Sequence, residues 1–225
     1  MPSIQKILIA NRGEIAVRVI RTAKRLGIKT VAVYSEADKD SLYVKLADEA
    51  MFIGPPEPKL SYLNQDTLLQ VILETGADAV HPGYGFLSEN AEFAEKLLAR
   101  GIKFLGPKPE SIRAMGDKIG SRLLVAKFNV PIVPGYEGED QSIERFKKEA
   151  EKIGFPIMAK ASAGGGGKGM RRVESMDELE ANILSAKREA LSSFGDDRIL
   201  LEKYITNPRH VEFQIFGDNH GNVIH

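Results

Sequence analysis

The chain has 225 residues and carries 31 Lys and Arg against 31 Asp and Glu, so its formal net charge at pH 7 is zero. A neutral chain has no long-range field toward polyanions, and we expect neither nucleic acid nor a membrane surface as a partner. The absence of cysteine excludes disulfides, thiolate metal sites and cysteine nucleophiles.

The amino terminus has no signal-peptide layout, and no apolar run approaches the roughly 20 residues that cross a bilayer. We therefore expect a soluble protein of a reducing compartment, in the first place the cytoplasm. A protein of the mitochondrial matrix or a plastid that has lost its transit peptide would have the same pattern.

The first hundred residues predict an open parallel α/β domain. Strands are expected at 7–10, 30–34, 50–53, 78–80 and 103–105, and helices at 14–26, 42–46, 65–75 and 91–100. Strand, helix and strand follow within about 30 residues, which is typical of right-handed parallel crossovers. The first strand–helix turn has one glycine where a dinucleotide site needs Gly-x-Gly-x-x-Gly, so the layering is Rossmann-like without that cofactor site.

The loop His81–Asn90 follows the strand predicted to end at Val80. Ligands of open α/β sheets lie beyond the carboxyl ends of the strands, where this loop is expected. Its glycines, proline and aromatic residues indicate a fixed shape, and Ser88 or Asn90 can cap the next helix. An ordered turn and a pocket wall explain the loop equally well.

Residues 108–131 are interpreted as a helical linker, with two short helices broken near Gly116-Asp117. Lys118 follows the break, close to a helix start, where a lysine is unfavourable with the helix dipole. Most exposed lysines are simply solvated, so this position alone decides nothing.

The second half of the chain predicts a smaller domain of strands and two helices. The helices are expected at 143–153 and after the capping box Ser175–Glu178, with Leu179, Ile183, Ala186, Ala190 and Phe194 on the buried face. A strand at 199–205 precedes a segment, 211–216, that alternates polar and apolar residues and predicts another strand. A turn at 217–222 and a return strand from 223 complete the prediction.

The run Lys160–Met170 contains five glycines between strands predicted at 155–159 and 170–173. Glycines give close backbone approach and N–H groups that can point at one anion, and Lys160 and Lys168 add flanking cations. The run therefore favours a loop folded over nucleotide phosphates. A glycine linker is the alternative, whereas a Walker A loop and a dinucleotide turn both need a helix directly after the glycines.

Several stretches taken together resemble the amino-terminal half of a biotin carboxylase, the ATP-grasp component of biotin-dependent carboxylases. They are Ile9–Ala16, His81–Asn90, Met115–Lys118, Lys160–Met170, Glu202–Tyr204 and Asn207–Glu212. Generic ATP-grasp ligases share the glycine hairpin but not the strings His-Pro-Gly-Tyr-Gly and Asn-Pro-Arg-His. The resemblance covers essentially the whole chain. It implies an α/β fold with a Rossmann-like domain at 1–107, a helical linker at 108–131, a small ATP-grasp lid domain at 132–203, and the start of the large ATP-grasp domain at 204–225.

The resemblance implies ATP-dependent carboxylation of carrier-bound biotin through carboxyphosphate, with Mg²⁺ as metal. It assigns the phosphates to Lys118 and Lys160, the closing loop to Gly166 and Gly167, the adenine to Glu202, Lys203 and Ile205, and a further nucleotide contact to His210. Lys168 stands where the family commonly has arginine. The family's magnesium, bicarbonate and base residues are expected beyond residue 225, so no catalytic or metal ligand is assigned, and we expect this chain alone to turn over nothing.

The expected partners are a biotin carboxyl carrier, a carboxyltransferase and a second copy of the chain, with Arg21 and Arg25 at the dimer interface, in a setting such as fatty acid biosynthesis. Three other functions remain open. They are an ATP-grasp ligase that joins a carboxylate to an amine, a non-catalytic nucleotide-binding or assembly module, and an oxidoreductase, which the missing dinucleotide fingerprint disfavours.

Overall fold

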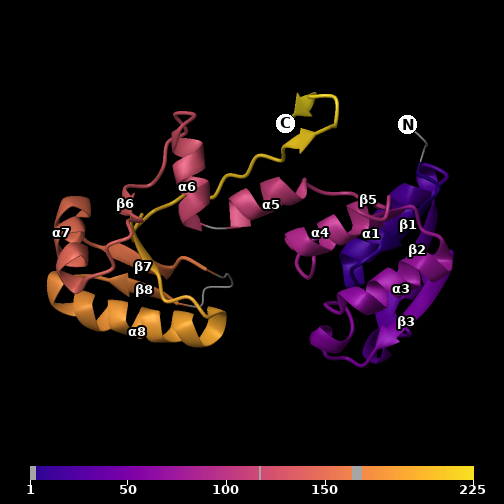
Figure 1. The fold of residues 1–225 in the computed structure, drawn as a ribbon, viewed down its shortest axis with the longest axis horizontal. Helices are drawn as coiled ribbons and strands as arrows, with labels where there is room; N and C mark the ends of the chain where they lie inside the picture. The colour runs from indigo at the N-terminus through magenta and orange to yellow at the C-terminus, as the bar shows by residue number, and fades with distance from the viewer. Residues whose placement is uncertain (1–3, 117, 164–168) are drawn as a thin grey trace. The chain divides into compact units, whose positions relative to one another are not determined.

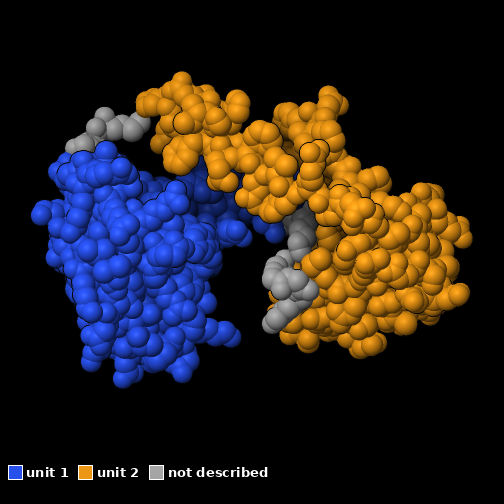
Figure 2. Space-filling view, turned by 180° about the vertical axis from the view of Figure 1, so that it is seen from behind, with its two compact units in different colours: residues 1–121 blue, residues 122–225 orange. Residues whose placement is uncertain are grey.

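The structure is a computed structural model that describes residues 4–116, 118–163 and 169–225, with only the backbone of Lys118. It divides into two compact units, residues 1–121 and 122–225, shown in different colours in Figure 2. None of the helices in the described ranges is long and apolar enough to span a membrane.

Unit 1, coloured from indigo to magenta in Figure 1, contains a five-stranded sheet. Its strand order is β3-β2-β1-β4-β5, and every pair of neighbours is parallel. The strands are β1 Lys6–Ile9, β2 Lys29–Ser35, β3 Glu49–Gly54, β4 Ala79–His81 and β5 Lys103–Phe104. This confirms the predicted open parallel sheet. The strand order reverses between β1 and β4, so the segments that follow these two strands are neighbours, and the Ala10 amide donates to the His81 carbonyl at 3.0 Å.

Helices cover both faces of this sheet, which is why the central strand β1 has the continuous buried run Ile7–Ile9. Helices α1 Gly13–Arg25 and α2 Leu42–Leu46 pack on one face over Ile7, Ile9 and Ala32. Helices α3 Gln65–Thr75 and α4 Ala91–Leu98 pack on the other. Asn90 caps α4, because its side-chain oxygen accepts a hydrogen bond from the Phe93 amide at 2.8 Å. Of the two predicted capping residues, the structure thus confirms Asn90. Helix α5 Pro109–Gly116 and two 3-10 turns, Glu36–Asp38 and Pro58–Leu60, complete the unit.

Unit 2 contains an antiparallel sheet in the order β6-β9-β7-β8, with α7 Ile143–Ile153 and α8 Met176–Phe194 packed against it. The strands are β6 Gly135–Tyr136, β7 Ile157–Ala161, β8 Met170–Val173 and β9 Ile199–Lys203. Alternate residues of β7 are buried, so one sheet face carries the core, and Met158 and Lys160 lie on the other face. Helix α6 Lys118–Ala126 crosses the boundary between the units.

Two local predictions for unit 2 are wrong. Ser175 is the N-cap of α8 but its side chain makes no capping hydrogen bond, and the Glu178 carboxylate accepts the Glu174 amide at 3.2 Å instead. Residues 211–215 form no strand, because the only pairing there joins β10 Phe216–Gly217 to β11 Val223–Ile224. A strand needs a neighbour for its backbone groups, and alternation alone supplies none.

Candidate functional site

The glycine hairpin has a fixed stem. Lys160 of β7 pairs with Met170 of β8, and the Ala161 amide donates to the Gly169 carbonyl at 2.9 Å. Gly169 has φ +66°, and an added Cβ would lie 2.8 Å from Ala161 Cβ, so only glycine fits there. This confirms the predicted hairpin. Residues 164–168, which include Gly166 and Gly167, lie outside the described residues.

Lys160 and Glu202 meet at the base of this hairpin. On β7 the buried Ile157, Ala159 and Ala161 face the helices, so Lys160 points to the opposite face. Glu202 pairs with Met158 in the neighbouring strand β9, two residues away from Lys160 on that face. The Lys160 ammonium and the Glu202 carboxylate form an ion pair, with 26% and 16% of their side chains exposed. The structure therefore brings two of the predicted site residues together.

A second cation holds the other oxygen of Glu202. Arg122 Nη1 lies 2.9 Å from Glu202 Oε1, and Arg122 Nε lies 3.7 Å from Glu137 Oε2. The sequence reasoning missed both Arg122 and Glu137. The available signal was the spacing of Arg122 from Lys118, one helical turn along the same predicted helix.

The end of β9 has a more specific arrangement than the sequence indicated. The Lys203 ammonium donates to the Gly154 and Phe155 carbonyls at 2.9 and 2.8 Å, after the end of α7, and so satisfies backbone acceptors there. The Arg172 guanidinium lies 4.4 Å from the centroid of the Tyr204 ring, and Ile205 is 47% exposed. Any contact of Lys203 with a nucleotide would therefore come from its backbone, which is the kind of contact the resemblance implies in part.

The structure leaves the roles of Lys118 and His210 open. Lys118 is the first residue of α6, and its side chain is not described. His210 lies in an exposed segment without regular structure, and its Nε2 is 3.0 Å from Glu212 Oε1. Both assignments remain predictions.

In unit 1, the loop after β4 is held from the turn after β1. The Asn11 side-chain amide donates to the Pro82 and Tyr84 carbonyls at 2.8 and 2.7 Å, and Asn11 is 4% exposed. Gly83 has φ +64°, and an added Cβ would lie 2.7 Å from Asn11 Nδ2. The Gly83 amide donates to His81 Nδ1 at 3.0 Å. These contacts favour the ordered-turn interpretation of the loop.

Arg12 joins a compact polar and aromatic cluster beside the same loop. Its guanidinium lies 5.4 and 5.6 Å from the ring centroids of Tyr62 and Phe86, which stack 5.0 Å apart. Asp38 accepts the Tyr62 hydroxyl at 2.6 Å and the Ser35 hydroxyl at 2.9 Å. Burial alone would raise the pKa of Asp38, but the hydrogen bonds from Tyr62, Ser35 and Arg12 outweigh it and hold the pKa below its ordinary value.

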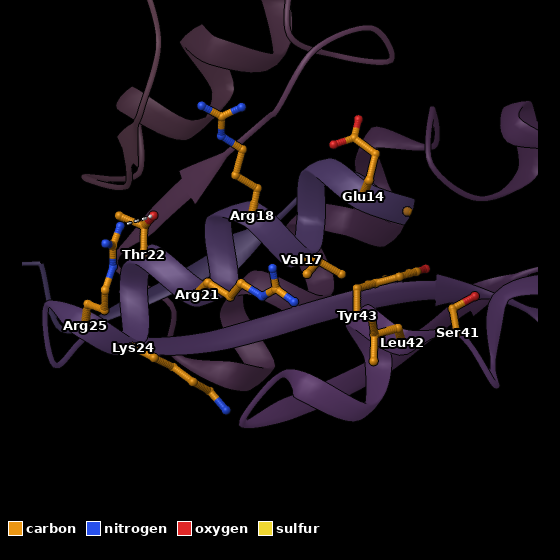
Figure 3. Close-up of a pocket in the computed structure, with 11 residues that line it drawn as sticks. Glu14, Val17, Arg18, Arg21, Thr22, Lys24, Arg25, Ser41, Leu42 and Tyr43 are labelled. Carbon is orange, nitrogen blue, oxygen red and sulfur yellow. Dashed lines mark hydrogen bonds between the residues drawn. The ribbon is translucent and has the colours of Figure 1, made fainter.

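Basic side chains of α1 line an open depression of about 1170 Å³ in unit 1 (Figure 3). Arg21 and Arg25, the residues expected at a dimer interface, both line it, as do Arg18 and Lys24. The Arg25 guanidinium donates to the Thr22 hydroxyl at 3.3 Å, as Figure 3 shows. The role of these arginines in dimer formation remains a prediction.

Within residues 4–116, 118–163 and 169–225, no group of three or more His, Cys, Asp or Glu side chains could hold a metal ion. The described part of the chain therefore places two cations, Lys160 and Arg122, at the base of the hairpin but forms no all-protein magnesium cage.

Two family descriptions match the chain. Residues 3–112 match the biotin carboxylase N-terminal domain, and residues 117–225 match the ATP-binding domain of the carbamoyl-phosphate synthase L chain. The chain is 59% identical over 222 residues to the mitochondrial methylcrotonoyl-CoA carboxylase subunit alpha of Arabidopsis thaliana, covering 99% of this chain and 30% of that protein. The mitochondrial propionyl-CoA carboxylase alpha chain of Homo sapiens is 54% identical over 222 residues, again 99% and 30% of the two chains. These names give no support to the expected setting of fatty acid biosynthesis.

Solved structures agree with this assignment. A biotin carboxylase in complex with β,γ-ATP from Campylobacter jejuni superposes with a TM-score of 0.94 at 49% identity, covering 99% of this chain and 50% of that one. The biotin carboxylase domain dimer of Hydrogenobacter thermophilus 2-oxoglutarate carboxylase, with MgADP, ADP and bicarbonate, gives 0.92 at 49% identity, covering 100% and 49%. The chain thus spans about half of these structures and less than a third of the two carboxylase subunits. With both of its halves matched, the chain belongs to the biotin carboxylase family of the biotin-dependent carboxylases.

Proposed function

We propose that this chain is the nucleotide-binding part of an enzyme that carboxylates carrier-bound biotin with bicarbonate and ATP. The observation that carries the proposal is the Lys160–Glu202 ion pair at the base of a glycine hairpin, in a chain that belongs to this family. Phosphoryl transfer needs positioning and charge neutralisation more than covalent chemistry from the protein, and a lysine at a glycine-rich loop suits both needs.

In the proposed reaction, a bicarbonate oxygen attacks the γ-phosphorus of ATP, and the bond from that phosphorus to the bridging oxygen of ADP breaks. Carboxyphosphate and ADP result. Carboxyphosphate then releases CO₂ and phosphate, a biotin ureido nitrogen gives its proton to the released phosphate, and that nitrogen adds to CO₂. Exclusion of water protects carboxyphosphate, and a loop that closes over the phosphates would provide it.

Each predicted site residue has a proposed task. The Lys160 ammonium neutralises a phosphate oxygen, and Glu202 and the backbone of Lys203 and Ile205 contact the adenine edge. The exposed Ile205 side chain supports an apolar contact with the base. Lys118 contacts a phosphate, and His210 contacts the nucleotide. The glycines Gly166 and Gly167 lie in the loop over the phosphates.

Magnesium, when bound in this family, neutralises phosphate charge. The described ranges contain no group of three or more His, Cys, Asp or Glu side chains that could hold it, and we derive no step through the metal. We propose that its ligands, and the bicarbonate and base residues, lie outside this chain. The 225-residue chain alone would then bind nucleotide weakly and have no turnover.

The proposed partners are a biotin carboxyl carrier, a carboxyltransferase and a second copy of the chain. The H. thermophilus neighbour is described as a dimer, which supports the last of these. The named carboxylase subunits are mitochondrial, which supports the matrix over the cytoplasm for the proposed compartment. Their acceptors are methylcrotonoyl-CoA and propionyl-CoA, so an acyl-CoA is the final acceptor that we favour.

The test is phosphate release from ATP by the full-length protein, with and without bicarbonate and free biotin. We expect ATP cleavage that requires bicarbonate and is stimulated by biotin. Stimulation by amino-acid or amine acceptors instead would indicate an ATP-grasp carboxylate–amine ligase. Bicarbonate-dependent cleavage by the isolated 225-residue chain would contradict its proposed inactivity.

A further inference from the structure

Glu202 is shared between two cations. Its Oε2 accepts from the Lys160 ammonium, and its Oε1 accepts from Arg122 Nη1 at 2.9 Å. We propose that Arg122 is a positioning residue that keeps Glu202 paired while Lys160 leaves that carboxylate for a phosphate oxygen of the nucleotide. This inference rests on the proposed function, because it requires Lys160 to bind phosphate.

Arg122 is held in place independently of Lys160. Its Nη2 donates to the Val133 carbonyl at 2.7 Å, and its Nε lies 3.7 Å from Glu137 Oε2. Its side chain is 11% exposed. A planar guanidinium with a rigid fork of donors can bind a carbonyl and a carboxylate at once, so Arg122 stays in position whether or not Lys160 is present.

The backbone beneath Arg122 leaves room for the guanidinium. A Cβ added to Gly135 would lie 2.4 Å from the Leu201 carbonyl oxygen and 3.0 Å from Arg122 Nη2. Gly135 of β6 pairs with Glu202 of β9, so the residue that leaves room for the guanidinium lies directly beside Glu202. A side chain at residue 135 would clash with the Leu201 carbonyl and crowd the guanidinium nitrogen that binds the Val133 carbonyl.

Charge explains why the second cation matters. Arg122, Lys160, Glu137 and Glu202 together carry two positive and two negative charges, all on side chains that are at least 74% buried. If Lys160 turns toward a phosphate, Glu202 keeps its hydrogen bond from Arg122. Without Arg122, the departure of Lys160 would leave a largely buried carboxylate with no cation, so Lys160 would resist leaving. Lysine suits the moving role because its ammonium is carried on a flexible stem.

The test is a double-mutant cycle in the full-length protein, with ATP affinity measured by calorimetry in the absence of bicarbonate. We expect Arg122→Met to weaken ATP binding by about tenfold, the scale of one charge-assisted hydrogen bond. In a Glu202→Gln background the same change should weaken binding by less than about twofold, because no carboxylate is left to retain Lys160. Arg122→Lys should lie between, since it keeps the charge but loses the fork.

Arg145→Met is the matched control, because Arg145 also pairs with a glutamate, Glu149 at 2.8 Å, in unit 2 but on α7. Its ATP affinity should equal that of the unmodified protein. Equal losses from Arg122→Met with and without Glu202→Gln would overturn the inference, as would no loss at all. If Arg122→Met does not fold, the same cycle is measured with Arg122→Lys. Equal losses of ATP affinity with and without Glu202→Gln would again overturn the inference.

The outcome for Lys160→Met separates this inference from the proposed function. Unchanged ATP affinity in Lys160→Met would overturn the phosphate-binding role and, with it, the role of Arg122. A loss in Lys160→Met without a loss in Arg122→Met overturns only the role of Arg122.

Discussion

Two loops of this molecule are anchored in opposite ways. The loop after β4 in unit 1 is held by Asn11, whose buried amide donates to two backbone carbonyls. The stem of the glycine hairpin in unit 2 carries the ion pair of Lys160 and Glu202. The acceptors of Asn11 are neutral backbone carbonyls of the loop itself, so these hydrogen bonds hold the loop in place. The acceptor of Lys160 is a carboxylate, and another anion can take its place on the ammonium. We therefore propose that the first loop is part of the scaffold and that a ligand replaces a protein group at the second.

The carboxylates near the two loops also differ in how they are paired. Asp38 in unit 1 is satisfied by Tyr62, Ser35 and Arg12, which together keep its pKa below the ordinary value despite burial. Glu202 in unit 2 depends on two cations, one fixed and one on a flexible stem. We propose that a ligand draws away the Lys160 ammonium while the Arg122 guanidinium stays paired with Glu202.

The largest expected effect is on the scaffold loop, from Gly83→Ala. Gly83 has φ +64°, and a Cβ there would lie 2.7 Å from Asn11 Nδ2, so the change adds left-handed strain and displaces a buried donor. We expect the free energy of unfolding to fall by about 3 kcal/mol. Hydrogen exchange of the β1 and β4 amides measures it.

Gly85→Ala is the matched control. Gly85 has φ +65°, but nothing lies within 4 Å of an added Cβ, so only the backbone strain applies. A loss of about 1 kcal/mol is expected. Equal losses at the two glycines would show that contact with Asn11 adds nothing.

The next largest effect is expected from Lys160→Met, which should change the affinity for ATP and not the stability of the fold. Under the proposed role of Lys160, this change removes one charge-assisted contact to phosphate, so ATP affinity should fall by about 10- to 100-fold. Because Arg122 still pairs with Glu202, the free energy of unfolding should change by less than about 1 kcal/mol. Lys147→Met, which breaks the exposed pair with Glu180, is the control for affinity. A stability loss in Lys160→Met as large as that of Gly83→Ala would remove the distinction between the two loops.

The smallest effect concerns pH and His81. Burial lowers the pKa of His81 from its ordinary value of 6.5. Its Nδ1 accepts the Gly83 amide, so a proton there would break a bond that holds the scaffold loop. Because the unfolded chain binds this proton more readily, stability is full above about pH 6.5 and falls as the pH is lowered through the folded-state pKa.

The measurement is urea unfolding of the protein and of His81→Gln between pH 7.5 and 5. The difference in unfolding free energy between them should shrink on acidification. A difference that stays constant over this range would rule out the role of His81.

The sequence predicted the periodic parts of the fold well. Helices at 65–75 and 143–153 and the strand at 170–173 have the predicted bounds, because their apolar spacing and flanking glycines are local signals. The strand at 211–216 was wrong, because pairing depends on a neighbour that alternation does not reveal. The contact of Glu178 with the Glu174 amide was equally hidden, since it depends on side-chain rotamers.

The candidate site was predictable in its residue types but not in its connections. The glycine run and the family resemblance pointed to Lys160 and Glu202 separately, but their ion pair depends on the register of β7 with β9. Arg122 was missed because its partners are 80 and 11 residues away in the sequence. The side-chain contacts of Lys203 with the carbonyls after α7 also depend on packing.

The most direct measurement is a crystal structure of the full-length protein with a non-hydrolysable ATP analogue. The account predicts that the Lys160 ammonium lies within hydrogen-bonding distance of a phosphate oxygen and no longer contacts Glu202, while Arg122 still donates to that carboxylate. A bound analogue with Lys160 still paired to Glu202 would contradict it.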